Sequence, residues 1–190
     1  PEVTDPKAWR GGRIPFLDKD NKVIFFFANV QNVIMRNTDL VSEGEVKSLS
    51  DLLQPKWKGQ MVMFDPSVSG SGQAWFSSVF KLIGREKGAE YMRQLVKQEP
   101  VITRDDRMLI EGVARGKYKI GIGISKGLFL DFKTKGASIE LFQTGEGYYI
   151  TPGIGATSLL KNAPHPNAAI VFLNWLLSKE GQTIAQATGG

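Results

Sequence analysis

The chain has 190 residues, of which 42% are hydrophobic, and its 24 lysines and arginines against 19 aspartates and glutamates give a net charge of +5. This is enough apolar material for a folded core, and the basic residues are scattered singly, so no concentrated nucleic-acid-binding surface is predicted. The lack of cysteine and the single histidine exclude a disulfide scaffold, thiol catalysis and a multi-histidine metal site.

Strand-like and helix-like patterns alternate along the chain. The first half is expected to hold, in order, an irregular lead-in over 1–21, strands over 23–28 and 30–35, a short helix opened by a capping box of Ser48 and Asp51, a strand over 60–64, a small-residue loop over 65–72 and a helix ending at Gly84. The second half is expected to hold a helix over 86–97 with Ala89, Met92 and Val96 on one face, a strand over 100–102, a helix opened by a capping box of Thr103 and Asp106, strands over 117–124, 138–142 and 148–151, an apolar run over 154–160, and two final helices.

This alternation predicts an α/β fold, a three-layer sandwich with helices on both faces of a central mixed β-sheet. The sheet is expected to form from the segments near 23, 60, 118, 138 and 154. No apolar run approaches the roughly 20 residues of a membrane-spanning helix.

The loop from Ser67 to Gly72 is the most informative local feature of the sequence. It leads into a helix predicted from Gln73, and a helix N-terminus presents unpaired N–H groups and a partial positive charge. A phosphate, phosphonate, carboxylate or sulfate would suit this loop. The candidate ligand-binding residues are Ser67, Ser69, Gly70, Ser71 and Gly72. The loop is not a P-loop, and the alternative is that Ser69 or Ser71 only caps the helix.

A second candidate is the stretch from Thr103 to Arg107, which places two carboxylates and two guanidiniums at a predicted helix start. A guanidinium fork binds anions well, and Arg107 is the candidate contact. The alternative is a solvated, capped helix end, because acidic residues are favoured in a first turn. Asp105 and Asp106 are adjacent and diverge on a helix, so they make a poor acid/base pair.

The remaining aromatic and histidine residues give weaker signals. Trp175 lies on an apolar stripe with Phe172 and is expected in the core. Trp57 is either buried under its loop or offered to a ligand, whereas His165 is expected to be a surface residue at a helix start. With no catalytic pair and no nucleotide motif, we expect no catalytic residue, no resident metal, no cofactor and no enzymatic activity.

Four stretches of the sequence together resemble one family. They are Asn37–Val41, Leu52–Pro66, Glu111–Tyr118, and Asn162–Ala169 with Phe172–Gln182. These stretches are similar to the extracellular solute-binding proteins of ABC importers, in the branch that contains ferric-iron, thiamine and aminoethylphosphonate binders. The resemblance implies a type II periplasmic-binding-protein fold, in which two α/β lobes joined by crossing strands hold the solute between them.

The resemblance also implies how the chain is divided. The chain opens without an initiator methionine or a signal sequence, and it is expected to be a fragment that lacks the N-terminal lobe. Residues 1–29 are then a lead-in and crossing segment, residues 30–150 the second lobe, and residues 151–190 a returning strand and C-terminal helices that pack on the first lobe. The Ser67–Gly72 loop falls where relatives often contact an anionic ligand.

The expected partners follow from the same resemblance. They are a small solute, anionic or metal-containing, and a membrane permease, for a monomeric protein in the periplasm or outside the cell that binds no nucleic acid. The sequence leaves the solute open among ferric iron, a phosphonate, thiamine, a polyamine and others. A ligand-sensing domain of a regulator or sensor kinase with the same fold is the alternative.

One departure from the family bears on the solute. Classical ferric binders carry paired tyrosines just after the strand that corresponds to 117–124, whereas this chain has Ser125–Phe129 there. Tyr148 and Tyr149 come too late in the chain to be that motif. This departure argues against ferric iron, which needs several anionic or phenolate ligands.

Overall fold

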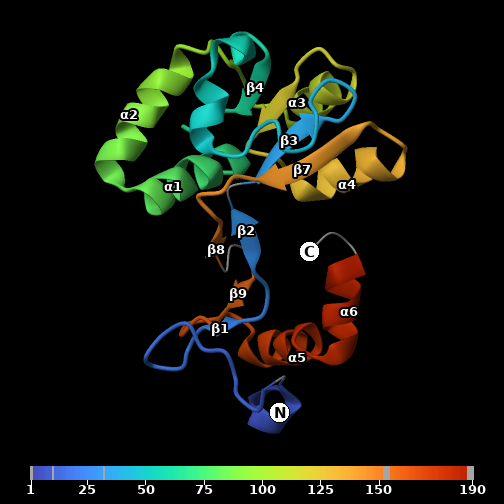
Figure 1. The fold of residues 1–190 in the computed structure, drawn as a ribbon. Coiled ribbons are helices and arrows are strands. Elements are labelled where there is room, and N and C mark those ends of the chain that lie inside the picture. The colour runs from blue at the N-terminus through green and yellow to red at the C-terminus, as the bar shows by residue number, and fades with distance from the viewer. Residues whose placement is uncertain (1, 10, 32, 152–154, 188–190) are drawn as a thin grey trace. The chain divides into compact units, whose positions relative to one another are not determined.

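The computed structural model describes residues 2–9, 11–31, 33–151 and 155–187. The chain divides into two compact units (Figure 1). The larger unit is Val30–Tyr149, and the smaller unit combines Pro1–Asn29 with Ile150–Gly190. No helix in the described ranges is long and apolar enough to cross a membrane.

The larger unit is built on a five-stranded mixed sheet of order β5-β4-β6-β3-β7. The strands are β3 (Val33–Asn37), β4 (Met61–Phe64), β5 (Val101–Thr103), β6 (Ile120–Ile122) and β7 (Ile139–Gln143). β4 pairs in parallel with both β5 and β6, whereas β3 pairs antiparallel with both β6 and β7. The sheet is therefore parallel at one side and antiparallel at the other.

Helices cover both faces of this sheet (Figure 1). The elements are the short 3₁₀ helices η3 (Leu49–Leu53) and η4 (Pro55–Trp57) and the α-helices α1 (Ser71–Ile83), α2 (Arg85–Val96), α3 (Asp106–Ala114) and α4 (Lys126–Thr134). Because side chains alternate along a strand, Met61 and Met63 pack in one core with α1, α2 and η3. Val62 and Phe64 pack in the other core with α3 and α4. The predicted three-layer α/β sandwich is confirmed.

The composition of the sheet differs from the prediction in two strands. The segments near 23 and 154 do not belong to it: β1 (Ile24–Phe25) pairs with β9 (Ala156–Thr157) in a two-stranded sheet of the smaller unit, and residue 154 itself lies outside the described residues. β3 and β5 take their places in the five-stranded sheet. An apolar run predicts a strand but does not say which strand it pairs with, and that is why the prediction was wrong here.

The remaining elements belong to the smaller unit or to its boundary. β2 (Asn29–Gln31) pairs with β8 (Tyr149–Thr151) in a further two-stranded sheet. The smaller unit also holds the 3₁₀ turns η1 (Glu2–Thr4) and η2 (Pro6–Ala8) and the helices α5 (Pro166–Leu176) and α6 (Lys179–Ala187). His165 is the exposed N-cap residue of α5, and its side chain makes no capping hydrogen bond.

One prediction of a buried side chain, in α5, was wrong, and in α2 only part of the predicted face with Ala89, Met92 and Val96 turns toward the core, where Met92 packs. Helix α2 buries Gly88, Tyr91 and Leu95, whereas Val96 is 71% exposed. Gly88 lies against Phe80 of α1, where a Cβ would come within 3.1 Å of Phe80 Cδ1, so the close approach of the two helices turns this face inward. In α5, Trp175 is 40% exposed rather than in the core.

Helix starts were predicted with mixed success. The capping box of Ser48 and Asp51 is present at η3. The capping box of Thr103 and Asp106 is not: Asp105 is the N-cap of α3, and its carboxylate accepts from the amide of Met108 at 3.0 Å. Asp105, rather than Thr103, is the N-cap residue because an aspartate carboxylate is a strong acceptor for the free amides of a helix start.

Candidate functional site

The parallel strands bring three helix starts to one edge of the sheet. β4, β5 and β6 run in the same direction, and α1, α3 and α4 begin shortly after them. We call this the carboxyl-end edge. α1 packs on one face of the sheet and α4 on the other, so the chain leaves β4 and β6 toward opposite faces. In open α/β sheets a ligand-binding crevice lies at such a point.

Two glycines bring the segments after β4 and β6 into backbone contact. A Cβ on Gly72 would come within 2.3 Å of the carbonyl oxygen of Phe64, and a Cβ on Gly123 would come within 2.8 Å of Cα of Gly72. Real Cβ atoms do not approach so closely, so only glycine fits without a shift of the backbone. At this point the edge is lined by backbone rather than by side chains.

Asp65 ties the ends of β4 and β5 together. Its Oδ1 accepts from the amide of Ser67 at 2.8 Å and from the hydroxyl of Ser67 at 2.6 Å. Its Oδ2 accepts from Nε of Arg104 at 2.8 Å, and its own amide donates to the carbonyl of Thr103 at 2.8 Å. The hydroxyl of Ser67, followed by Arg104, lowers the pKa of Asp65 to about 2. Asp65 is therefore an ionised anchor for this part of the edge.

The residues of the predicted loop have different environments in the structure. The hydroxyl of Ser67 is already held by Asp65, whereas Ser69 and Gly70 are exposed. Gly70 is the N-cap of α1 with a φ of 145°, a conformation that favours glycine, and the cap has no side-chain hydrogen bond. Helix α1 thus begins at Ser71, two residues before the predicted Gln73.

Neither Ser69 nor Ser71 caps α1 through its side chain, so the alternative interpretation of this loop is wrong. The Oγ atom of Ser71 is buried, and it has no hydrogen-bond partner in the part of the chain that the structure describes. Buried hydroxyls are almost always paired, so an unpaired one at a helix start is a natural contact for a ligand.

The two arginines of the second candidate stretch lie in different places. Arg104 contacts Asp65, whereas the guanidinium of Arg107 lies over the ring of Phe132 in α4, 5.7 Å from its centroid. The structure thus puts Arg104, not Arg107, on Asp65, which binds Ser67, and a solute contact of Arg107 stays a prediction. Arg104, which directly follows β5, belonged to the candidate stretch but was not named as its contact residue. In the same stretch, the pKa of the Asp106 carboxyl is raised, mainly because this group is partly buried and secondly because the Asp105 carboxylate is next to it.

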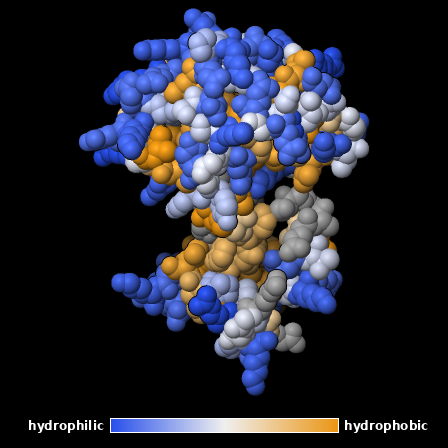
Figure 2. All heavy atoms as spheres, viewed as in Figure 1, coloured by the Kyte–Doolittle hydropathy of each residue, from blue (hydrophilic) through white to orange (hydrophobic). Residues whose placement is uncertain are grey.

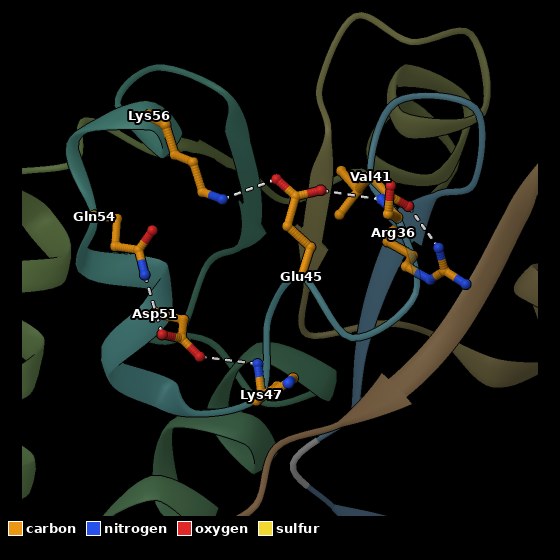
Figure 3. Close-up of polar contacts among 8 residues, drawn as sticks. Arg36, Val41, Glu45, Lys47, Asp51, Gln54 and Lys56 are labelled. Atoms are coloured by element: carbon orange, nitrogen blue, oxygen red, sulfur yellow. Dashed lines mark hydrogen bonds and ion pairs between the residues drawn. The ribbon is translucent and has the colours of Figure 1, made fainter.

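A cavity of about 540 Å³ lies along β7, beneath the loop over residues 41–47. Figure 3 draws polar contacts around it: Arg36 donates to the carbonyl of Val41, and Lys56 is paired with Glu45 at 2.8 Å. Arg36 is also paired with Glu140. The buried guanidinium of this cavity is therefore already satisfied by the protein itself, which disfavours the cavity as the main site for an anion.

A second cavity, of about 370 Å³, lies at the carboxyl-end edge. Its lining residues are Val30, Val33, Lys126, Leu141, Phe142 and Gln143. Val33 begins β3 and is paired with Gln143, the last residue of β7. Because β3 is antiparallel to β6, the start of β3 lies where β6 ends, with Ile34 opposite Ile122. This cavity therefore belongs to the same edge as the Ser67–Gly72 loop.

The sheet covered on both faces, with small-residue and charged loops at its carboxyl-end edge, has the architecture of a lobe of a type II periplasmic solute-binding protein, and the comparisons with known proteins make that assignment. The sequence model of the family "Bacterial extracellular solute-binding protein" matches residues 20–189, and the chain belongs to this family.

Individual relatives agree with this assignment. An uncharacterised protein of Haemophilus influenzae is 29% identical over 159 residues, which is 80% of this chain and 44% of that protein. Iron uptake protein A1 of Synechocystis is 24% identical over 180 residues, 88% of this chain and 49% of that protein. Among solved structures, the periplasmic binding protein AfuA of Actinobacillus pleuropneumoniae, with fructose 6-phosphate bound, is 26% identical with a TM-score of 0.76, covering 98% of this chain and 60% of AfuA. The chain spans about half the length of the curated relatives it matches.

Proposed function

We propose that the protein is the substrate-binding component of an ABC importer, which captures a small solute in a cleft between two lobes and delivers it to a membrane permease. The observation that carries this proposal is the family match over residues 20–189. The carboxyl-end edge of the larger unit is the part of the cleft that this chain contributes. The protein is not an enzyme in this account, because its role is to bind and release the solute unchanged.

The larger unit is one lobe, and residues 1–29 and 151–190 belong with the other lobe. Two observations support this division. The curated relatives are about twice as long as the segment that matches this chain, which leaves room for a further lobe. Figure 2 shows hydrophobic residues exposed over the smaller unit, and in α5 Val171 is 69% and Phe172 54% exposed. Large exposed apolar patches mark surfaces that another part of a protein covers.

The solute is anionic in this proposal. Ser69, Gly70, Ser71 and Gly72 offer amides and hydroxyls at the start of α1, with the Ser71 hydroxyl unpaired in the described structure. Ser67 acts through Asp65, whose carboxylate is also paired with Arg104, and Arg107 is proposed as a further solute contact. The sugar phosphate held by AfuA is a solute of this chemical kind.

Ferric iron is the less favoured solute, although one relative is named an iron uptake protein. Ser125–Phe129 stands where classical ferric binders carry paired tyrosines. Within the described residues, no three histidine, aspartate or glutamate side chains lie together as metal ligands would.

In this proposal the receptor works in the periplasm or outside the cell, as a monomer with a permease as its partner; the family match supports the location and the partner. A ligand-sensing domain of a regulator or sensor kinase is the alternative function. A cleavable signal or lipid-attachment sequence upstream of this chain supports the receptor, and a DNA-binding or membrane-spanning segment supports the sensor.

A thermal-shift screen of the full-length protein tests the proposal, with sugar phosphates, phosphonates, organic acids, thiamine, polyamines and ferric chelates as probes. A solute at 100 times its Kd should stabilise the folded protein by about 2.7 kcal/mol. Native mass spectrometry then gives the stoichiometry, expected to be one solute per chain. A protein that binds none of these solutes by either method contradicts the proposed function.

A further inference from the structure

The cavity of about 370 Å³ at the carboxyl-end edge is lined by both apolar and polar side chains. Four of its lining residues are apolar: Val30, Val33, Leu141 and Phe142. The other two are Lys126 and Gln143, which offer an ammonium group and an amide. An apolar wall with a few polar groups is typical of a site for a small organic molecule.

Lys126 is the first residue of α4 and is half-buried. Within the described residues, no aspartate or glutamate forms an ion pair with it, although seven other lysines or arginines of the larger unit have such a partner, namely Arg36, Lys56, Lys58, Arg93, Arg104, Arg115 and Lys135. The half-buried Lys126 side chain thus carries a positive charge that no carboxylate of the described residues neutralises by an ion pair. Its charge is therefore available to an anion that enters the cavity.

The position of Lys126 connects this cavity with the Ser67–Gly72 loop. Lys126 follows Gly123 by three residues, and Gly123 lies against the backbone of Gly72. The short segment from Gly123 to Lys126 thus connects the start of α1 with the cavity that Lys126 lines. Gln143 lies at the same end of the sheet, because it is paired with Val33 at the start of β3.

We infer that Lys126 is the residue that selects the solute, by pairing with the negatively charged group of a small organic anion whose carbon skeleton packs on Val33 and Leu141. Gln143 supplies a second polar contact. This inference rests on the proposed function and narrows it: the solute is an organic phosphate, phosphonate or carboxylate, and free ferric ion is repelled by the ammonium group. Inorganic phosphate carries the charge but lacks the carbon skeleton, so it binds more weakly.

Isothermal titration calorimetry on the full-length protein tests the inference with four probes: fructose 6-phosphate, aminoethylphosphonate, inorganic phosphate and ferric nitrilotriacetate. The variants are Lys126→Met, which keeps the length of the stem, and Lys126→Arg, which keeps the charge. Lys133→Met is the matched control, because Lys133 is an exposed lysine near the other end of the same helix. The urea midpoint of each variant without solute shows whether it is folded.

We expect at least one of the organic anions to bind the wild-type protein more tightly than inorganic phosphate. Lys126→Met should weaken that binding by about 10-fold or more, the loss typical of a charge-assisted hydrogen bond, with an unchanged urea midpoint. Lys126→Arg should retain most of the affinity, and Lys133→Met all of it.

Other results overturn the inference in distinguishable ways. Equal affinity of wild type and Lys126→Met for an organic anion refutes the role of Lys126 but leaves the proposed function standing. The same holds if only the ferric chelate binds, or if inorganic phosphate binds as tightly as the organic anions. A full-length protein that binds no probe here and no solute in the wider screen contradicts the proposed function as well.

Discussion

Gly72 and Gly123 meet through their backbones, so that a Cβ on Gly123 would come within 2.8 Å of Cα of Gly72. This contact joins the start of α1 to the segment between β6 and α4. It positions two of the three helix starts at the carboxyl-end edge, and it does so without side chains. The candidate site therefore depends on glycine at both positions.

Gly72→Ala is expected to destabilise the protein by about 2 to 3 kcal/mol, because the added methyl group overlaps the carbonyl oxygen of Phe64 and overpacking of this kind costs that much. Urea unfolding measures the change. Gly127→Ala is the matched control: Gly127 lies in α4 with nothing within 4 Å of a Cβ, so alanine there should stabilise by about 0.5 kcal/mol. Equal effects of the two substitutions would contradict the close packing of Gly72.

Ser71→Ala separates a ligand contact from a helix cap. Because the Ser71 hydroxyl has no partner in the described structure, its loss should change the free energy of unfolding by less than about 0.5 kcal/mol, whereas a lost cap costs about 1 kcal/mol. Solute affinity should fall about 10-fold. Ser77→Ala, on the exposed side of the same helix, is the control and should change neither quantity. Unchanged affinity with a lowered urea midpoint would make Ser71 a structural residue only.

Asp65→Asn should lower stability near neutral pH, but not in strong acid. The pKa of Asp65 is about 2 in the folded protein, below the value of about 3.9 in an unfolded chain, so ionised Asp65 favours folding. That contribution is fully present above about pH 4 and is lost as the pH falls toward 2. Urea midpoints of wild type and Asp65→Asn should therefore differ at pH 6 and converge at about pH 2. A difference that stays constant over this range would show that Asp65 is not held as an anion by Ser67 and Arg104.

Glu146→Ala should loosen the segment between β7 and β8. Both carboxylate oxygens of Glu146 accept from the amide of Leu49, at 2.9 and 3.1 Å, and the amide of Gly145 donates to the carbonyl of Lys47 at 2.6 Å. Loss of the carboxylate should cost about 1 to 2 kcal/mol and speed hydrogen exchange at the Leu49 amide. Glu43→Ala, an exposed glutamate of the neighbouring loop, should do neither. Unaltered exchange at Leu49 in Glu146→Ala would refute this contact.

The sequence predicts individual helices and strands better than it predicts which strands pair in a sheet. The strand at 60–64, the small-residue loop and the capping box of Ser48 and Asp51 are all local patterns, and the structure contains them. Sheet order is a long-range property, and this is why the run near 23 was placed in the wrong sheet. α4 was missed because Gly127 near its start weakens the helical pattern, although Phe129 and Phe132 have helical spacing.

The candidate site shows the same limit. Its serine and glycine loop was visible in the sequence because a run of small residues directly before a helical pattern is a local signal. The hydrogen bonds of Asp65 to Ser67 and Arg104 were not visible, because Asp65 and Arg104 are 39 positions apart in the sequence and meet only when β4 and β5 pair. Lys126 likewise has no motif of its own, and only the cavity beside β3 and β7 gives it a role.

The most direct test of the central claim is the set of backbone amide shifts in the full-length, isotope-labelled protein as it is titrated with the solute that the screen identifies. We expect the changes within the larger unit to concentrate at residues 69–72 after β4 and 123–126 after β6, the two segments that Gly72 and Gly123 join. Changes concentrated instead around Arg36, Val41 and Lys47, at the cavity beneath the 41–47 loop, would contradict the claim that the carboxyl-end edge receives the solute.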